Sequence, residues 1–134
     1  MSNVFHLAIP VHNLDLARNF YQNIGATIGR EGKHTLVMNL FQAQVVCHLS
    51  PEDFVSKPKM YPRHFGVIME RLSFLTEKYH QLKEKMPEIF FKELFVRNEG
   101  EFIEHTTFFV QDPSGNLIEF KNYKNQNAIF NQGI

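Results

Sequence analysis

The order of predicted elements occurs twice along this chain, and that repeat limits the fold more than any other feature. In residues 4–11 the large apolar side chains recur at every second position, at Phe5, Leu7, Ile9 and Val11, which predicts a strand, and residues 13–25 repeat apolar side chains at helical spacing. Three short strands follow, and after the proline-containing connector 50–62 the same order begins again. The predicted strands lie at about 4–11, 26–30, 34–41, 44–49, 63–69, 88–97, 102–111 and 116–123, and the predicted helices at 13–25 and 72–85.

A strand followed by a helix and three further strands forms an α+β unit, and its repetition indicates two such units. We therefore expect two βαβββ modules, at about residues 4–50 and 63–123, within a single domain that spans residues 1–134. The two sheets would join edge to edge into one cupped mixed sheet, with the helices on its outer face and a cavity on the other. Residues 124–134 form a mainly polar C-terminal tail.

Charge and composition argue against several classes of function. The 14 Lys and Arg residues balance the 14 Asp and Glu residues and form no basic stripe, which argues against nucleic acid or an anionic membrane as a partner. The single cysteine, Cys47, excludes an intrachain disulfide and favours a reducing compartment. No apolar run approaches the roughly 18 residues that span a bilayer, and the N-terminus lacks the pattern of a signal peptide. We expect a cytoplasmic protein.

Three polar side chains are predicted to meet on the face of the sheet that carries no helix. His6 and His64 hold matching positions in the first strands of the two modules, and Glu119 lies in the middle of the apolar last strand. Two imidazoles and one carboxylate, with open positions opposite, are a known ligand set for divalent metals. A buried carboxylate is costly without a partner, and a metal ion removes that cost. The alternative is that all three are ordinary polar residues on a solvated sheet.

The chain contains the segments FHLAIPVHNLDLARNFYQNIGA, HFGVIM and TTFFVQDPSGNLIEFKNY, of which the last is the most specific. These segments resemble the vicinal oxygen chelate superfamily, which includes glyoxalase I, fosfomycin-resistance enzymes, bleomycin-resistance proteins and extradiol dioxygenases. The resemblance implies paired βαβββ modules with a divalent metal in the cupped sheet. It also implies ligands on the first strand of each module and on the last strand of the second, at His6, His64 and Glu119.

The last strand of the first module departs from part of this superfamily. Members that resemble glyoxalase I place a fourth ligand there, a carboxylate. Aligning FQAQVVCHLS with PSGNLIEFKN puts Cys47 opposite Glu119, so that Cys47 faces the cavity and His48 faces the helix layer; a one-residue bulge would exchange the two. Cys47 is a candidate substrate contact or, alternatively, a buried inert thiol. His48 is a candidate acid/base residue or, alternatively, a packed histidine.

Two residues of the second module are further candidates. His105 could line the cavity as an acid/base residue, although its neighbours Glu101 and Glu104 also fit a solvated loop edge. Arg97 is a candidate substrate-binding residue between two strands, with an exposed hairpin tip as the alternative. The sequence shows no basic cluster of the kind that a phosphonate substrate would require.

Two functions compete at this point. The first is a metal-dependent enzyme that binds two vicinal oxygens of a small molecule, and it would be dioxygenase-like or, as a lyase or isomerase, glyoxalase-like. One divalent ion per site is expected, with Fe(II) or Mn(II) favoured over Zn(II) or Ni(II). The second is a metal-free protein of the bleomycin-resistance type that binds a small molecule or drug. The resemblance also implies a homodimer, with modules that pair either within one chain or across the dimer.

Overall fold

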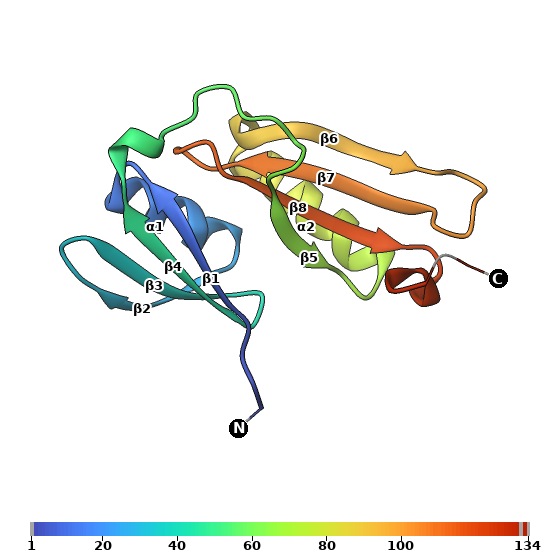
Figure 1. Cartoon of the computed structure of the whole chain (residues 1–134). Helices are drawn as coiled ribbons and strands as arrows, with labels where there is room; N and C mark the ends of the chain where they lie inside the picture. The colour runs from blue at the N-terminus through green and yellow to red at the C-terminus, as the bar shows by residue number, and fades with distance from the viewer. Residues whose placement is uncertain (1, 132, 134) are drawn as a thin grey trace. The chain divides into compact units, whose positions relative to one another are not determined.

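The computed structural model describes residues 2–131 and residue 133. The chain forms two compact units, and each contains one four-stranded mixed sheet and one α-helix (Figure 1). The predicted α+β class with two βαβββ modules is therefore confirmed. Neither of the two α-helices in the described part of the chain has the length and apolar character needed to cross a membrane.

Unit 1 extends to Lys59 and also contains the separate segment Asp112–Asn116. Its elements are β1 (His6–Val11), α1 (Leu14–Ile24), β2 (Thr27–Glu31), β3 (Thr35–Leu40), β4 (Ala43–Leu49) and the 3₁₀ helix η1 (Pro51–Asp53). The strand order in the sheet is β1-β4-β3-β2. Strands β1 and β4 run parallel, and the other neighbouring strands run antiparallel.

Unit 2 comprises Met60–Gln111 and the chain from Leu117 onward. Its elements are β5 (Phe65–Ile68), α2 (Leu72–Lys85), η2 (Pro87–Ile89), β6 (Phe90–Arg97), β7 (His105–Gln111), β8 (Leu117–Tyr123) and η3 (Gln126–Ile129). The strand order is β5-β8-β7-β6, and β5 runs parallel to β8. The first strand of each unit therefore pairs with the last strand of the same unit.

Helix α1 illustrates how the local sequence directs the fold. The Asn13 side chain accepts a hydrogen bond from the backbone N–H of Leu16 and caps the first turn. Gly25 ends the helix with a φ of 121°, which glycine adopts without steric cost. The helix turns one apolar face toward the core of unit 1, and its buried residues are Ala17, Phe20, Tyr21 and Ile24.

Several strands begin later than predicted. Strand β5 begins at Phe65 rather than at residue 63, and β7 begins at His105 rather than at residue 102. Backbone hydrogen bonds from Glu101 to Asn98 and from Glu104 to Glu101 turn the chain before β7, so this stretch is not available for strand pairing. Part of the predicted C-terminal tail forms η3. The joining of the two sheets into one cupped sheet, and of the two modules into a single domain, stays a prediction.

Candidate functional site

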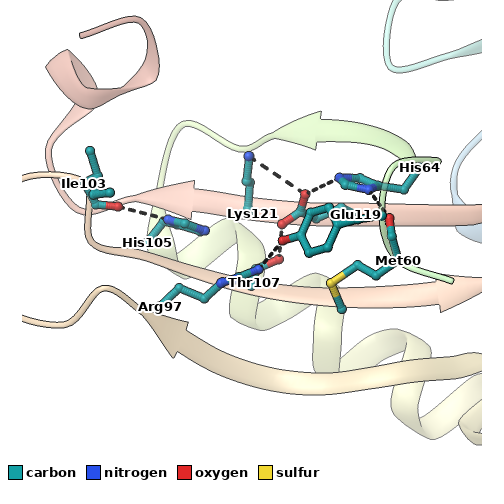
Figure 2. A network of polar contacts seen from close by, with 9 residues as sticks. Met60, His64, Arg97, Ile103, His105, Thr107, Glu119 and Lys121 are labelled. Carbon is teal, nitrogen blue, oxygen red and sulfur yellow. Dashed lines mark hydrogen bonds and ion pairs between the residues drawn. The ribbon is translucent and has the colours of Figure 1, made fainter. Parts of the chain in front are cut away.

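Glu119, in β8, is a buried carboxylate with partners on both oxygens. The residue is 6% exposed. The Thr107 hydroxyl of β7 donates a hydrogen bond to Oε2 over 2.6 Å, and His64 Nε2 lies 3.2 Å from Oε1. Lys121 Nζ lies 3.8 Å from the same Oε1 (Figure 2). The carboxylate is therefore held in one orientation, with Oε1 directed toward His64.

The hydrogen bond at His64 Nδ1 determines which nitrogen of the neutral ring carries the lone pair. Nδ1 lies 2.7 Å from the Met60 backbone carbonyl, and because a carbonyl only accepts, Nδ1 carries a proton and donates it. In the neutral imidazole, Nε2 then carries a lone pair, and that lone pair lies next to Glu119 Oε1. Two acceptor atoms at 3.2 Å repel each other unless a proton or a metal cation lies between them. The pair is therefore suited to share a proton or to bind a cation.

The parallel pairing of β5 with β8 brings these two side chains together. Gly66 is the register partner of Glu119. His64 immediately precedes β5, two residues before Gly66, and its contact with Glu119 Oε1 places it on the same face. The structure thus brings together two of the three predicted ligands within unit 2. Their role as metal ligands stays a prediction.

The third predicted ligand, His6, lies in unit 1. It is exposed at the start of β1, and its Nδ1 lies 2.8 Å from Gln44 Oε1. With Nδ1 donating to the amide oxygen, Nε2 keeps its lone pair, as in His64. Within either unit, the described residues form no group of three or more His, Cys, Asp or Glu side chains that could hold a metal ion.

The register of unit 1 corrects the alignment of the two last strands. In unit 2, the residue two positions after His64 pairs with Glu119; in unit 1, the residue two positions after His6 pairs with Val46. Val46 therefore holds the position that corresponds to Glu119, and its side chain has no atom that could bind a metal. The prediction that Cys47 corresponds to Glu119 is wrong by one residue, because an alignment of short strands without a fixed register can slip by one.

This shift exchanges the expected faces of Cys47 and His48. Cys47 pairs with Ile9 and is 0% exposed, so the thiol is a buried core group; its role as a substrate contact stays a prediction. His48 pairs with Pro10, which shares the face of His6, and His48 is exposed. Cys47 and His48 therefore lie on the faces that were expected only for a strand with a one-residue bulge. No described contact gives His48 an acid/base role, which stays a prediction.

The buried thiol predicts a loss of stability in alkali. Burial raises the pKa of Cys47 to about 12, and the Asp112 carboxylate adds to that shift. In the unfolded chain a cysteine titrates near pH 8.5, so between about pH 9 and pH 12 the folded chain holds a proton that the unfolded chain has lost. The free energy of unfolding should therefore fall by about 1.4 kcal/mol per pH unit in this range because of Cys47.

Urea unfolding of the parent and of Cys47→Ala at several alkaline pH values tests this prediction. The free energy of unfolding should decline less steeply with pH in the variant, and equal slopes in the two proteins would refute the assignment.

His105 lies on the same face of the unit 2 sheet as Glu119. Alternation along β7 places His105 on the side of Thr107, whose hydroxyl contacts Glu119. His105 Nδ1 donates to the backbone carbonyl of Ile103 over 3.0 Å, and its ring lies 4.9 Å from that of Tyr123. Among the described contacts, His105 forms no hydrogen bond or ion pair with Glu119. Its acid/base role stays a prediction.

Arg97 ends β6 and pairs in register with His105, so it lies on this face as well. Its guanidinium donates a hydrogen bond to the Tyr61 hydroxyl and lies 5.8 Å from the centre of the Tyr61 ring. The Tyr61 ring in turn lies 5.6 Å from the ring of His64. Arg97 is half-buried rather than fully solvated at a hairpin tip, and Tyr61 contacts both Arg97 and His64.

The site residues predicted from the sequence did not include two side chains of this face, Thr107 and Tyr61. Period-2 alternation placed Lys121 with Glu119 and could have placed Thr107 with His105. It could not have shown that Thr107 meets Glu119, because that contact depends on the β7–β8 register. Nothing in the sequence pattern indicated Tyr61, which lies in the irregular segment before β5.

The family model described as Glyoxalase/Bleomycin resistance protein/Dioxygenase superfamily matches residues 3–120. A crystal structure of a glyoxalase/bleomycin resistance protein/dioxygenase from Alicyclobacillus acidocaldarius is 38% identical, with a TM-score of 0.90 over 96% of this chain and 97% of that chain. No curated protein matches the chain.

Two more distant structures share the fold alone. The fosfomycin resistance protein FosX from Listeria monocytogenes is 15% identical, with a TM-score of 0.74 over 96% of this chain and 99% of that chain. A lactoylglutathione lyase from Agrobacterium tumefaciens is 13% identical, with a TM-score of 0.65 over 91% of this chain and 94% of that chain.

Proposed function

This chain belongs to the Glyoxalase/Bleomycin resistance protein/Dioxygenase superfamily, and from that premise we propose that it is a metal-dependent enzyme acting on a small molecule. The observation that carries the proposal is the 3.2 Å approach of His64 Nε2 to Glu119 Oε1, with Nδ1 of the same ring already donating to Met60. Histidine ligands of metal ions commonly donate their other ring N–H to a carbonyl in this way. The superfamily includes enzymes, such as the lyase and FosX named above.

The available donor atoms fit a divalent ion. His64 offers Nε2 and Glu119 offers Oε1, and His6 is proposed as the third ligand through its own Nε2. Two imidazole nitrogens and one carboxylate oxygen suit Fe(II) or Mn(II), with Zn(II) or Ni(II) as alternatives. When bound, such an ion supplies a Lewis acid to two adjacent oxygens of a substrate. The fourth ligand of members that resemble glyoxalase I, a carboxylate on the last strand of the first module, has no counterpart on β4, because Val46 holds that position.

The protein's own side chains would do the remaining work. Thr107 donates to Oε2, so Oε1, the oxygen next to His64 Nε2, is the atom of Glu119 proposed to face the ion. Met60 fixes the ring of His64, and Gln44 the ring of His6. His105, on the same face as Thr107, is the candidate base for a dioxygenase-like or glyoxalase-like reaction.

One observation favours a second function, a metal-free small-molecule binding protein of the bleomycin-resistance type. Aromatic side chains accompany the polar groups on the Glu119 face of unit 2: the exposed Tyr61 and the buried Phe109 each pack edge-on against His64. An exposed ring such as that of Tyr61 can bind the apolar part of a ligand without help from a metal. In either function we propose a small molecule as the partner and a homodimer as the assembly.

Metal content tests the proposal. Protein purified without chelator should contain about one divalent ion per chain, and His6→Ala, His64→Ala and Glu119→Ala should each lose most of it, because each removes a direct ligand. His34→Ala, which changes an exposed histidine with no described side-chain hydrogen bond, serves as the matched control and should retain the ion. No metal in the parent after reconstitution with Fe(II), Mn(II), Zn(II) and Ni(II) would exclude the enzyme and leave the binding protein.

A further inference from the structure

The Glu119 face of the unit 2 sheet carries more positive than negative charge. Arg97 and Lys121 lie on it, and Lys92 joins them because it pairs in register with Phe109, the partner of Glu119. Within the described residues of β5–β8, Glu119 is the one carboxylate on this face. The chain as a whole has no net charge, so the excess of cations is a local property of this face.

Glu93, the neighbour of Lys92, does not offset this charge. Its carboxylate accepts hydrogen bonds from Tyr79 and Lys83 of α2, so it belongs to the helix-covered side of the sheet. The side chains of Lys92 and Glu93 therefore lie on opposite faces of the sheet, at a bulge in β6 between Lys92 and Phe95. The expectation that the chain has no basic cluster was therefore incomplete: strand pairing assembles one.

Arg97 is the cation best placed to bind a ligand. In the described residues it forms no ion pair, and its partners are the Tyr61 hydroxyl and the rings of Tyr61 and Phe95, the latter 6.0 Å from the guanidinium. A half-buried guanidinium with aromatic neighbours and no carboxylate retains most of its capacity for a bidentate contact with an oxyanion. Lys121, by contrast, lies 3.8 Å from Glu119.

We infer that this face binds an anionic small molecule, a compound whose carboxylate or phosphonate group contacts Arg97 while its other polar end lies at His64 and Glu119. Tyr61 separates the two ends, since it receives the Arg97 hydrogen bond and packs against His64. The inference rests on the proposed function and adds the charge class of the substrate to it. Lys92 and Lys121 raise the positive electrostatic potential of this face and so attract the anion, without a defined contact to it.

Binding of matched probes tests the inference. Benzoate and phenylphosphonate carry the two candidate anions, and benzamide is a neutral compound with the shape of benzoate. Titration followed by NMR should show that at least one anion binds about tenfold more tightly than benzamide, because a charge-assisted contact is worth about that factor or more. The anion that binds more tightly distinguishes a carboxylate substrate from a phosphonate.

The variant Arg97→Gln should weaken anion binding about tenfold while leaving benzamide binding and metal content unchanged. Arg30→Gln, an exposed position of unit 1, makes the same change of net charge and should bind anions as the parent does. Equal binding of anions and benzamide, no saturable binding of either anion, or an unchanged affinity in Arg97→Gln would overturn the inference. A parent without metal that still binds anions through Arg97 would refute the metal-dependent enzyme and leave this inference standing.

Discussion

Replacing Gly66 with alanine should destabilise the protein by at least about 3 kcal/mol, because a side chain at this position overpacks the junction of β5 and β8. A Cβ atom built on Gly66 would lie 1.8 Å from the backbone oxygen of Glu119 and 2.8 Å from its nitrogen. Those atoms belong to the neighbouring strand and cannot rotate away, so the strands must separate. The separation would break the register that holds His64 beside Glu119.

Chemical unfolding followed by circular dichroism measures this effect. The matched control is Gly32→Ala, whose Cβ would meet the Thr35 hydroxyl at 3.4 Å and the Thr35 carbonyl oxygen at 3.9 Å, both ordinary contacts. The Gly66 variant should unfold at a much lower urea concentration or fail to accumulate as folded protein, whereas the control should stay within about 1 kcal/mol of the parent. A Gly66→Ala protein that unfolds at the parent's urea concentration would show that the strands can part without cost.

Replacing Asp112 with alanine should cost about 3–5 kcal/mol, since it removes the centre of a buried hydrogen-bond network. The carboxylate is 2% exposed. Oδ1 accepts from the backbone N–H groups of Ser114 and Asn116, both over 2.8 Å, and Oδ2 accepts from the Tyr21 hydroxyl over 2.6 Å and from the Asn116 amide over 2.8 Å. Without the carboxylate, the buried Tyr21 hydroxyl and the buried Ser114 N–H would lose this acceptor, and the Asn116 amide would keep only its hydrogen bond to the Pro10 carbonyl.

Two further variants divide this effect into parts. Tyr21→Phe removes one of the donors to Asp112 and should cost only about 1–2 kcal/mol, because the other hydrogen bonds to the carboxylate remain. Asp15→Ala is the control, since that aspartate is exposed and pairs with Arg18, and its loss should change stability by less than about 1 kcal/mol. Thermal and urea unfolding of the three variants should rank them in this order. An Asp112→Ala protein as stable as Asp15→Ala would contradict the role assigned to the network.

The network also explains the conspicuous turn sequence DPSGN. These residues connect β7 to β8, yet they belong to unit 1, where Asp112 meets Tyr21 of α1. Gly115 has a φ of 96°, and a Cβ there would lie 2.1 Å from the Val55 carbonyl, so only glycine fits. Composition identified the segment as a turn, but its long-range partners come from residues about ninety positions away and could not be read from it.

The geometry of the candidate site likewise depends partly on local sequence and partly on long-range strand pairing. That His64 and Glu119 avoid the helix-facing side of their strands followed from alternation alone, which is a property of each strand by itself. That His64 Nε2 reaches Glu119 Oε1, and that Thr107 reaches the other oxygen, required the pairing of β5 and β7 with β8. The errors at Cys47 and His48 arose where a register had to be guessed, because a slip of one residue reverses every side chain of a strand.

The sequence alone determined the elements of this protein, their order and their repetition, because capping residues, glycines and apolar periodicity act over a few neighbouring positions. It also determined the family. Only the tertiary structure decided that Val46 corresponds to Glu119, that Cys47 is buried, and that cations gather on one sheet face. Those outcomes depend on which strands pair and in what register, and these are set by the packing of segments that lie far apart in the chain.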